Sequence, residues 1–165
     1  MKLAAAVATT VSLGLCGFSL QVRARESGGA PQSVGPANPA RVPGSVWDGV
    51  YTLGQARRGA ALSERCVTCH GADLEGDIAP TLVGPAFAQR WNGWSLGDVF
   101  GMVVPNFRVE SKDVPAAERE ELIHQQSADF LAYILFGNRF PAGQTELPNN
   151  VQVLKQIRFQ KNKPQ

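Results

Sequence analysis

The chain is short of side chains that bind metals or form cross-links. Its 165 residues include three cysteines, two histidines and two methionines. A tetrahedral zinc site needs four Cys or His ligands, and only Cys16 and His124 lie outside the segment 66–70. So few cysteines exclude a disulfide framework, and the strand that precedes a thioredoxin-like dithiol is missing from the pattern. The thiols that are present are therefore not expected to form a zinc site, a disulfide framework or a thioredoxin-like redox centre.

The sequence also lacks an excess of charge of one sign. It has 16 basic and 14 acidic residues, a formal net charge of +2. A chain so balanced is not a nucleic-acid binder by bulk charge, and we expect no nucleic acid among its partners. The acidic segment Asp73–Asp77 and the basic segment Lys155–Lys163 are expected to be solvated surface, because exposed charge pairs are usually weak.

Long hydrophobic runs are absent except near the start. Residues 1–20 carry one positive charge at Lys2, no acid, and an apolar run from Leu3. Val22 and Ala24 then place small or aliphatic side chains at the positions that a signal peptidase reads. This pattern predicts a signal peptide over residues 1–24 and a periplasmic protein without a strong membrane signal after cleavage. A retained N-terminal membrane anchor is the alternative, although the run is short for a spanning helix.

The segment Cys66-Val67-Thr68-Cys69-His70 carries the chemistry. Two thiols at this spacing can add to the two vinyl groups of a haem as thioethers, and the adjacent imidazole can ligate the iron. Cys16 leaves with the signal peptide, so both remaining thiols are available for this purpose. We therefore predict one covalent haem c, held by Cys66 and Cys69 with His70 as the proximal axial ligand.

The remaining sequence divides into three parts. Residues 25–45 are rich in Gly, Pro and Ala, cannot bury enough apolar surface to fold, and are expected to form a flexible tether. Residues 46–140 form the expected domain, of about 95 residues, a size at which a buried haem would help a marginal core. Residues 141–165 form a C-terminal extension that is basic at its end and has apolar residues spaced to pack back onto the domain.

Capping signals and apolar spacing predict an all-α domain. Thr52 and Gln55 resemble a capping box that begins a helix reaching about Arg65, with Gly59–Ala61 as a slim face for close crossing by another helix. A second helix is expected over Leu96–Val104, with Ser95 as its cap. A third is expected over Ser127–Phe136, ended by Gly137. The expectation is about three to five helices around one haem.

The pattern over residues 46–140 resembles a mono-haem class I cytochrome c. The resemblance rests on Cys66–Gly71, on Pro80–Gly84, and on Asp129, Ala132 and Tyr133 in the last helix. It implies a small helical fold whose first and last helices cross beside the haem. It also implies that the Pro80 carbonyl accepts the other imidazole proton of His70 and fixes the orientation of that ring.

A narrower similarity concerns the flanks of the domain. They look like those of bacterial cytochromes that accompany quinoprotein and other periplasmic dehydrogenases, which suggests redox proteins of that class as partners. The segments that carry this similarity are Val46–Thr52, Trp91–Trp94 and Phe140–Pro148.

The second axial ligand is left open by the sequence. Such cytochromes usually present a methionine after the middle helix, and the alignment places Phe107 there, which cannot ligate iron. Met102 is the distal candidate, although it lies about 140° from position 107 on an ideal helix and could instead pack in the core. His124 is a less favoured candidate that could simply cap the final helix. The third possibility is an open site beside Phe107.

These features together predict a periplasmic one-electron carrier between a dehydrogenase or respiratory donor and a downstream acceptor. No nucleophile or general base stands out, so we expect an electron-transfer protein rather than an enzyme. Two alternatives remain. A labile sixth site would suit gas or peroxide sensing or a minor peroxidase, and a fixed complex would make the chain a dehydrogenase subunit.

Overall fold

The computed structural model describes residues 43–165, and this part of the chain is helical without a β-strand. The predicted signal peptide and residues 25–42 of the predicted tether lie outside the described residues. The prediction of an all-α protein is confirmed for the described part. Its elements are η1 (Val46–Asp48), α1 (Leu53–Ala61), α2 (Glu64–His70), α3 (Gly84–Trp91), α4 (Leu96–Val103), η2 (Val104–Asn106), α5 (Ala116–Gly137) and α6 (Val151–Leu154).

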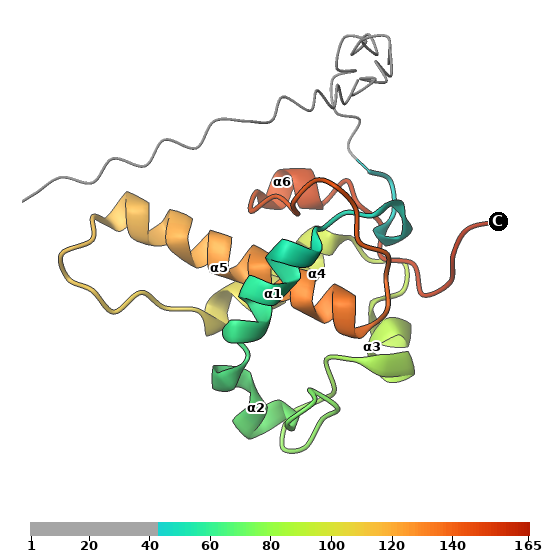
Figure 1. Ribbon diagram of the computed structural model, residues 1–165, viewed down its shortest axis with the longest axis horizontal. Coiled ribbons are helices and arrows are strands. Elements are labelled where there is room, and N and C mark those ends of the chain that lie inside the picture. Colours follow the sequence, from blue (N-terminus) through green and yellow to red (C-terminus); the bar gives the residue numbers. More distant parts are fainter. Residues whose placement is uncertain (1–42) are drawn as a thin grey trace, which may run out of the picture. The chain divides into compact units, whose positions relative to one another are not determined.

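Helices α1 and α5 cross at close range and form the centre of the domain (Figure 1). The crossing depends on Gly59, because a Cβ atom at this position would lie 1.9 Å from the Asp129 carbonyl oxygen. The predicted slim face is therefore confirmed at Gly59, whereas Ala61 is exposed. At the same contact, the guanidinium of the neighbouring Arg58 binds both carboxylate oxygens of Asp129 at 2.9 Å.

The first predicted helix is wrong in its length. It ends at Ala61, and α2 begins separately at Glu64. The break is stabilised locally: the Ser63 hydroxyl donates to the Ala60 carbonyl at 2.7 Å, and the Leu62 and Ser63 amides close tight turns onto the preceding carbonyls. A serine hydroxyl can form such hydrogen bonds with nearby backbone groups, which offers the backbone an alternative to continuing the helix. The consequence is that α2 can take its own direction.

Helix α4 agrees with its prediction. The Ser95 hydroxyl accepts the Asp98 amide, and the Asp98 carboxylate accepts the Ser95 amide, which together form a capping box. The helix ends at Val103, and the chain continues in the short 3-10 turn η2, which contains Pro105. The middle of the domain is therefore one short helix, after which the backbone changes direction in η2.

Helix α5 is longer than predicted. It begins at Ala116 rather than near Ser127, and Gly137 is its last residue rather than a stop signal beyond it. His124 accordingly lies inside this helix and does not cap it. The first ten residues are mostly exposed, while Ser127–Phe130 and the residues that follow reach the core. No helix among residues 43–165, this one included, combines the length and apolar character needed to cross a membrane.

The C-terminal segment is part of the same compact unit as the helices before it. Its apolar side chains Leu147, Leu154, Ile157 and Phe159 are completely or almost completely buried. Gln55, expected to complete a capping box with Thr52, instead binds this segment: its side chain donates to the Leu147 carbonyl at 2.9 Å and accepts the Leu147 amide at 2.7 Å. Residues 141–165 therefore complete the core.

Candidate functional site

The three residues of the motif lie on one short helix. Helix α2 carries Cys66, Cys69 and His70, and it ends at Gly71, which has a positive φ of 84°. A residue with a Cβ atom rarely adopts that conformation. The same position is crowded, since a Cβ atom there would lie 2.7 Å from the Glu75 carboxyl carbon. Glycine after the histidine therefore lets the chain turn back under the helix.

The loop after α2 holds the His70 ring. The Ala79 amide donates to the Cys69 carbonyl at 2.7 Å, and the Gly76 amide donates to the His70 carbonyl at 2.6 Å. These bonds fold the loop onto the end of the helix. The Pro80 carbonyl oxygen then lies 2.6 Å from His70 Nδ1. A carbonyl oxygen only accepts, so Nδ1 carries the proton and Nε2 keeps its lone pair.

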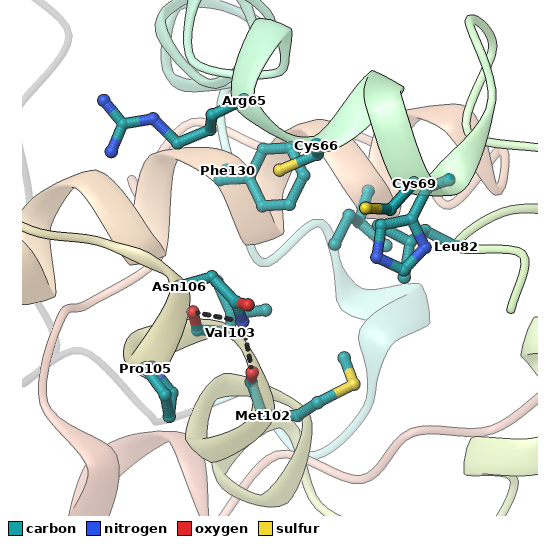
Figure 2. A pocket seen from close by; sticks show the side chains of 11 residues that line it. Arg65, Cys66, Cys69, Leu82, Met102, Val103, Pro105, Asn106 and Phe130 are labelled. Carbon is teal, nitrogen blue, oxygen red and sulfur yellow. Dashed lines mark hydrogen bonds between the residues drawn. The ribbon is translucent and has the colours of Figure 1, made fainter. Parts of the chain in front are cut away.

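A cavity of about 510 Å³ opens beside this loop. Its volume is in the range of small-ligand and cofactor sites. Cys66, Cys69 and His70 form one wall, and Leu82, Phe130 and Ile134 make much of the remainder apolar. Figure 2 shows Cys66 and Cys69 on one side of the cavity with Met102 on the opposite side. Helices α2, α4 and α5 therefore all contribute to one pocket.

The two thiols differ in their surroundings. Both are free cysteines; Cys66 is buried and Cys69 is exposed. Burial raises the pKa of the Cys66 thiol, and the charge of the neighbouring Arg65 partly opposes that effect. Both residues line the cavity, three positions apart on α2 and therefore close to one helical turn from each other.

The structure separates the three residues considered for the other side of the site. Met102 is half-buried and lines the cavity. Phe107 is buried in the core instead, with its ring centroid 5.7 Å from that of Phe130 and the Arg65 guanidinium 5.2 Å above it. His124 packs near the Phe100 ring at 5.7 Å and is not part of the cavity wall. The helix ends before Phe107, so the two positions are not constrained to one helical face.

The residues that line this pocket do not gather as the ligands of a bare metal ion would. Within residues 43–165, no group of three or more His, Cys, Asp or Glu side chains is close enough together to hold a metal ion alone. The motif residues are instead spread along one wall of the cavity. The residues present can bind a haem: two thiols at an apolar wall, one imidazole with a free Nε2, and a thioether opposite.

Two further residues of the pocket were not foreseen from the sequence. Arg65 lies at the mouth beside Cys66, and Asn106 lies near Met102, where its side-chain amide donates to the Met102 and Val103 carbonyls at 2.9 and 3.1 Å. Asn106 thus ends α4 and fixes the backbone of Met102. Its place directly after Pro105, at a helix end, is the available sequence signal.

Comparison with known proteins gives no relative. No family model, no curated protein and no solved structure matches the chain. Its function must therefore be inferred from its own residues and from the geometry of this pocket.

Proposed function

We propose that this chain is a periplasmic one-electron carrier with a single covalent haem c, built on a small cytochrome c fold. The observation that carries the proposal is the pocket itself. Two thiols, an imidazole oriented by a backbone carbonyl, and a thioether from another helix all border the same apolar cavity. When bound, the haem supplies an iron centre that gains and loses one electron.

The residues of the pocket have distinct roles in this proposal. Cys66 and Cys69 would hold the haem through thioether bonds, and His70 Nε2 would ligate its iron. The Pro80 carbonyl keeps the proton on Nδ1 and restricts rotation of the ring. Leu82, Phe130 and Ile134 exclude water from the haem face.

Met102 is the proposed distal ligand. Its side chain lines the cavity from the wall opposite the cysteines, whereas Phe107 and His124 lie outside the cavity wall (Figure 2). A methionine–histidine pair raises the reduction potential of a haem, as an electron carrier at the oxidising end of a chain requires. Asn106 supports this role because it holds the Met102 carbonyl at 2.9 Å.

The location and partners of the protein follow from the same chemistry. Haem attachment to exported thiols agrees with the predicted signal peptide over residues 1–24, and the periplasm is the proposed compartment. The proposed partners are redox proteins, among them a quinoprotein or other periplasmic dehydrogenase. The chain transfers electrons rather than converting a substrate, so we propose that it is not an enzyme by itself.

The covalent haem is tested on the exported protein. Denatured wild-type protein should retain a red pigment through extraction with acidified organic solvent, and its mass should exceed that of the cleaved polypeptide by one haem. The Cys66→Ser/Cys69→Ser variant should release or lack the pigment. A colourless wild type, or a pigment that extracts completely, contradicts the proposal.

The distal ligand is tested separately by spectroscopy. Met102→Ala should abolish the absorption and paramagnetic signatures of methionine ligation and allow the ferrous protein to bind carbon monoxide promptly. His124→Ala, the matched control, should leave both unchanged. Prompt carbon monoxide binding by the wild type would instead favour the alternative of an open sixth site, which suits gas or peroxide chemistry.

A further inference from the structure

A second cavity of about 510 Å³ lies between the end of α3, the start of α4 and the segment after α6. It shares no lining residue with the pocket beside Cys66. We call it the tryptophan hollow, and define it by Arg90, Trp91, Trp94, Gly101 and Lys155. It is shallow and open to solvent, and the proposed electron carrier has no use for it.

Trp94 is an exposed but fixed side chain at the edge of the hollow. It is 54% exposed, although its backbone is held on both sides: its amide donates to the Trp91 carbonyl at 3.0 Å, and its carbonyl accepts the Phe159 amide at 2.8 Å. Its ring meets the edge of Trp91 at 5.9 Å between centroids. A large aromatic side chain that is already ordered loses little entropy on binding and is typical of interface hot spots.

The surroundings of the hollow are positively charged. The Arg90 guanidinium lies over Trp91 at 5.7 Å, and Lys155 lines the opposite side. Arg158 and Lys161 lie beside the turn that carries Trp94, and their side chains bind neutral oxygens, of Gly93 at 3.0 Å and of Gln89 at 2.7 Å. Among the described residues, the ion pairs involve Arg58 and none of these cations.

The acidic side chain at the hollow cancels only part of this charge. Asp98 lines it, and its carboxylate is bound by the amide and the hydroxyl of Ser95 at 2.9 and 2.6 Å. It is therefore occupied in capping α4. The hydrogen bonds from Ser95 lower the pKa of Asp98, and the Lys155 charge also helps to lower it. Four cations against one carboxylate still leave a net positive charge at a surface that also presents an exposed indole.

We propose that the tryptophan hollow docks an acidic segment of a partner protein that inserts an apolar side chain beside Trp94. The cations extend beyond the cavity to Arg158 and Lys161, which suits a polypeptide rather than a single small anion. Residues 1–42 of the chain are an unsuitable occupant, because Glu26 is their single acid. A bilayer is also a poor match, since it needs protruding apolar side chains rather than a concave surface.

The proposal is tested with the full exported protein and a labelled synthetic peptide in which glutamates surround one leucine. Fluorescence anisotropy should show binding that weakens with salt, and the Trp94 emission should shift to shorter wavelength. Arg90→Gln/Lys155→Gln should weaken binding about tenfold or more. Trp94→Ala should weaken it by a similar factor, as expected for an aromatic anchor.

Gly101→Leu provides a test without a change of charge. A Cβ atom at Gly101 has no heavy atom within 4 Å, so the added side chain can occupy the hollow without displacing the protein. This variant should weaken peptide binding as strongly as Trp94→Ala. Far-UV circular dichroism and the visible absorption spectrum should remain those of the wild type, which separates occlusion of the hollow from damage to the fold or the haem.

The controls identify the other outcomes. Arg108→Gln/Lys112→Gln removes the same charge from a distant loop and should change affinity less than about twofold. An equal loss in this control, or no binding by the wild type, overturns the proposal. It is also overturned if Trp94-dependent binding is found for vesicles of anionic phospholipid but not for the peptide. Concentration-dependent self-association lost in Gly101→Leu would assign the hollow to a second copy of the chain and equally overturn it.

Discussion

Two parts of the domain differ in how they are held together. Residues 62–83, with α2 and the loop after it, place only Cys66, Leu74 and Leu82 among the buried apolar side chains. Ile78, in the same loop, is 80% exposed. This part, which we call the haem-side segment, is held mainly by short backbone hydrogen bonds. Helices α1, α4 and α5 and residues 141–165 instead supply most of the buried core, and we call them the packed half.

The difference shows what each part requires. The packed half has many apolar contacts among its own side chains, so we expect it to depend less on an added group. The haem-side segment has an apolar cavity where comparable contacts would otherwise be. In the proposed protein, a haem supplies those contacts and ties the segment to the core. Loss of the haem should therefore loosen one part and spare the other.

The largest expected effect comes from removing both attachment points. In Cys66→Ser/Cys69→Ser without haem, amides of residues 62–83 should exchange with solvent about tenfold faster or more, while α4 and the second half of α5 keep their protection. Hydrogen exchange followed by mass spectrometry measures both regions at once. Equal loss of protection in both would mean that the packed half also depends on the haem.

Phe159→Ala tests the packed half. The Phe159 ring is fully buried and packs edge-on against Phe87 and Phe140, so its removal should lower the free energy of unfolding by about 3–5 kcal/mol. Chemical denaturation gives this value. Phe136→Ala is the matched control: this side chain is 51% exposed, and the loss should stay below about 1 kcal/mol. Similar losses in the two variants would contradict the assigned packing.

Gln55→Leu tests the polar contact that fixes residues 141–165. The change leaves the buried amide and carbonyl of Leu147 without their partner, at a cost of about 2 kcal/mol or more. Gln144→Leu, at an exposed position of the same segment, should be nearly neutral. Denaturation curves of the two variants distinguish a specific hydrogen-bonded pair from a general preference for a polar side chain.

The smallest effect is expected at the cap of α4. Hydrogen bonds from Ser95 lower the pKa of the Asp98 carboxyl. A lowered pKa in the folded state stabilises the protein above the unfolded value of about 3.9, and this stability is lost as the pH falls through the folded pKa. Asp98→Asn should therefore cost about 0.5–1 kcal/mol near neutral pH and less near pH 3. Thermal unfolding at both pH values, with Asp113→Asn as an unaffected control, checks this difference.

Local signals in the sequence predicted part of this fold well. Ser95 indicated the start of α4, and Gly59 indicated a close crossing by another helix. The break at Ser63 was missed because a serine can either continue a helix or end it, and only the tertiary course of α2 decides between them. The polar start of α5 was missed because its residues face solvent and show no apolar spacing, although Ala, Glu and Arg are good helix formers there.

Long-range contacts explain the remaining differences. Nothing near Gln55 in sequence indicates that its side chain binds Leu147, 92 residues later. Phe159 stands among basic and polar residues, so its burial against Phe87 and Phe140 carries no local pattern. In the pocket, the resemblance gave the candidate residues, but whether Met102 or Phe107 lines the cavity depends on where α4 ends. That end is set by Asn106 and the η2 turn.

The backbone near Ser45 and that near Arg158 lie side by side: the Val46 amide donates to the Arg158 carbonyl, and the Arg158 amide donates to the Gly44 carbonyl, both at 3.0 Å. The two ends of the polypeptide between residues 44 and 158 are therefore adjacent in space. A short glycine-rich linker could join residue 44 to residue 160, with new ends placed in the exposed loop around Lys112. Circular permutants of this kind should reach the same native packing, since the order of attachment would change and the contacts would not.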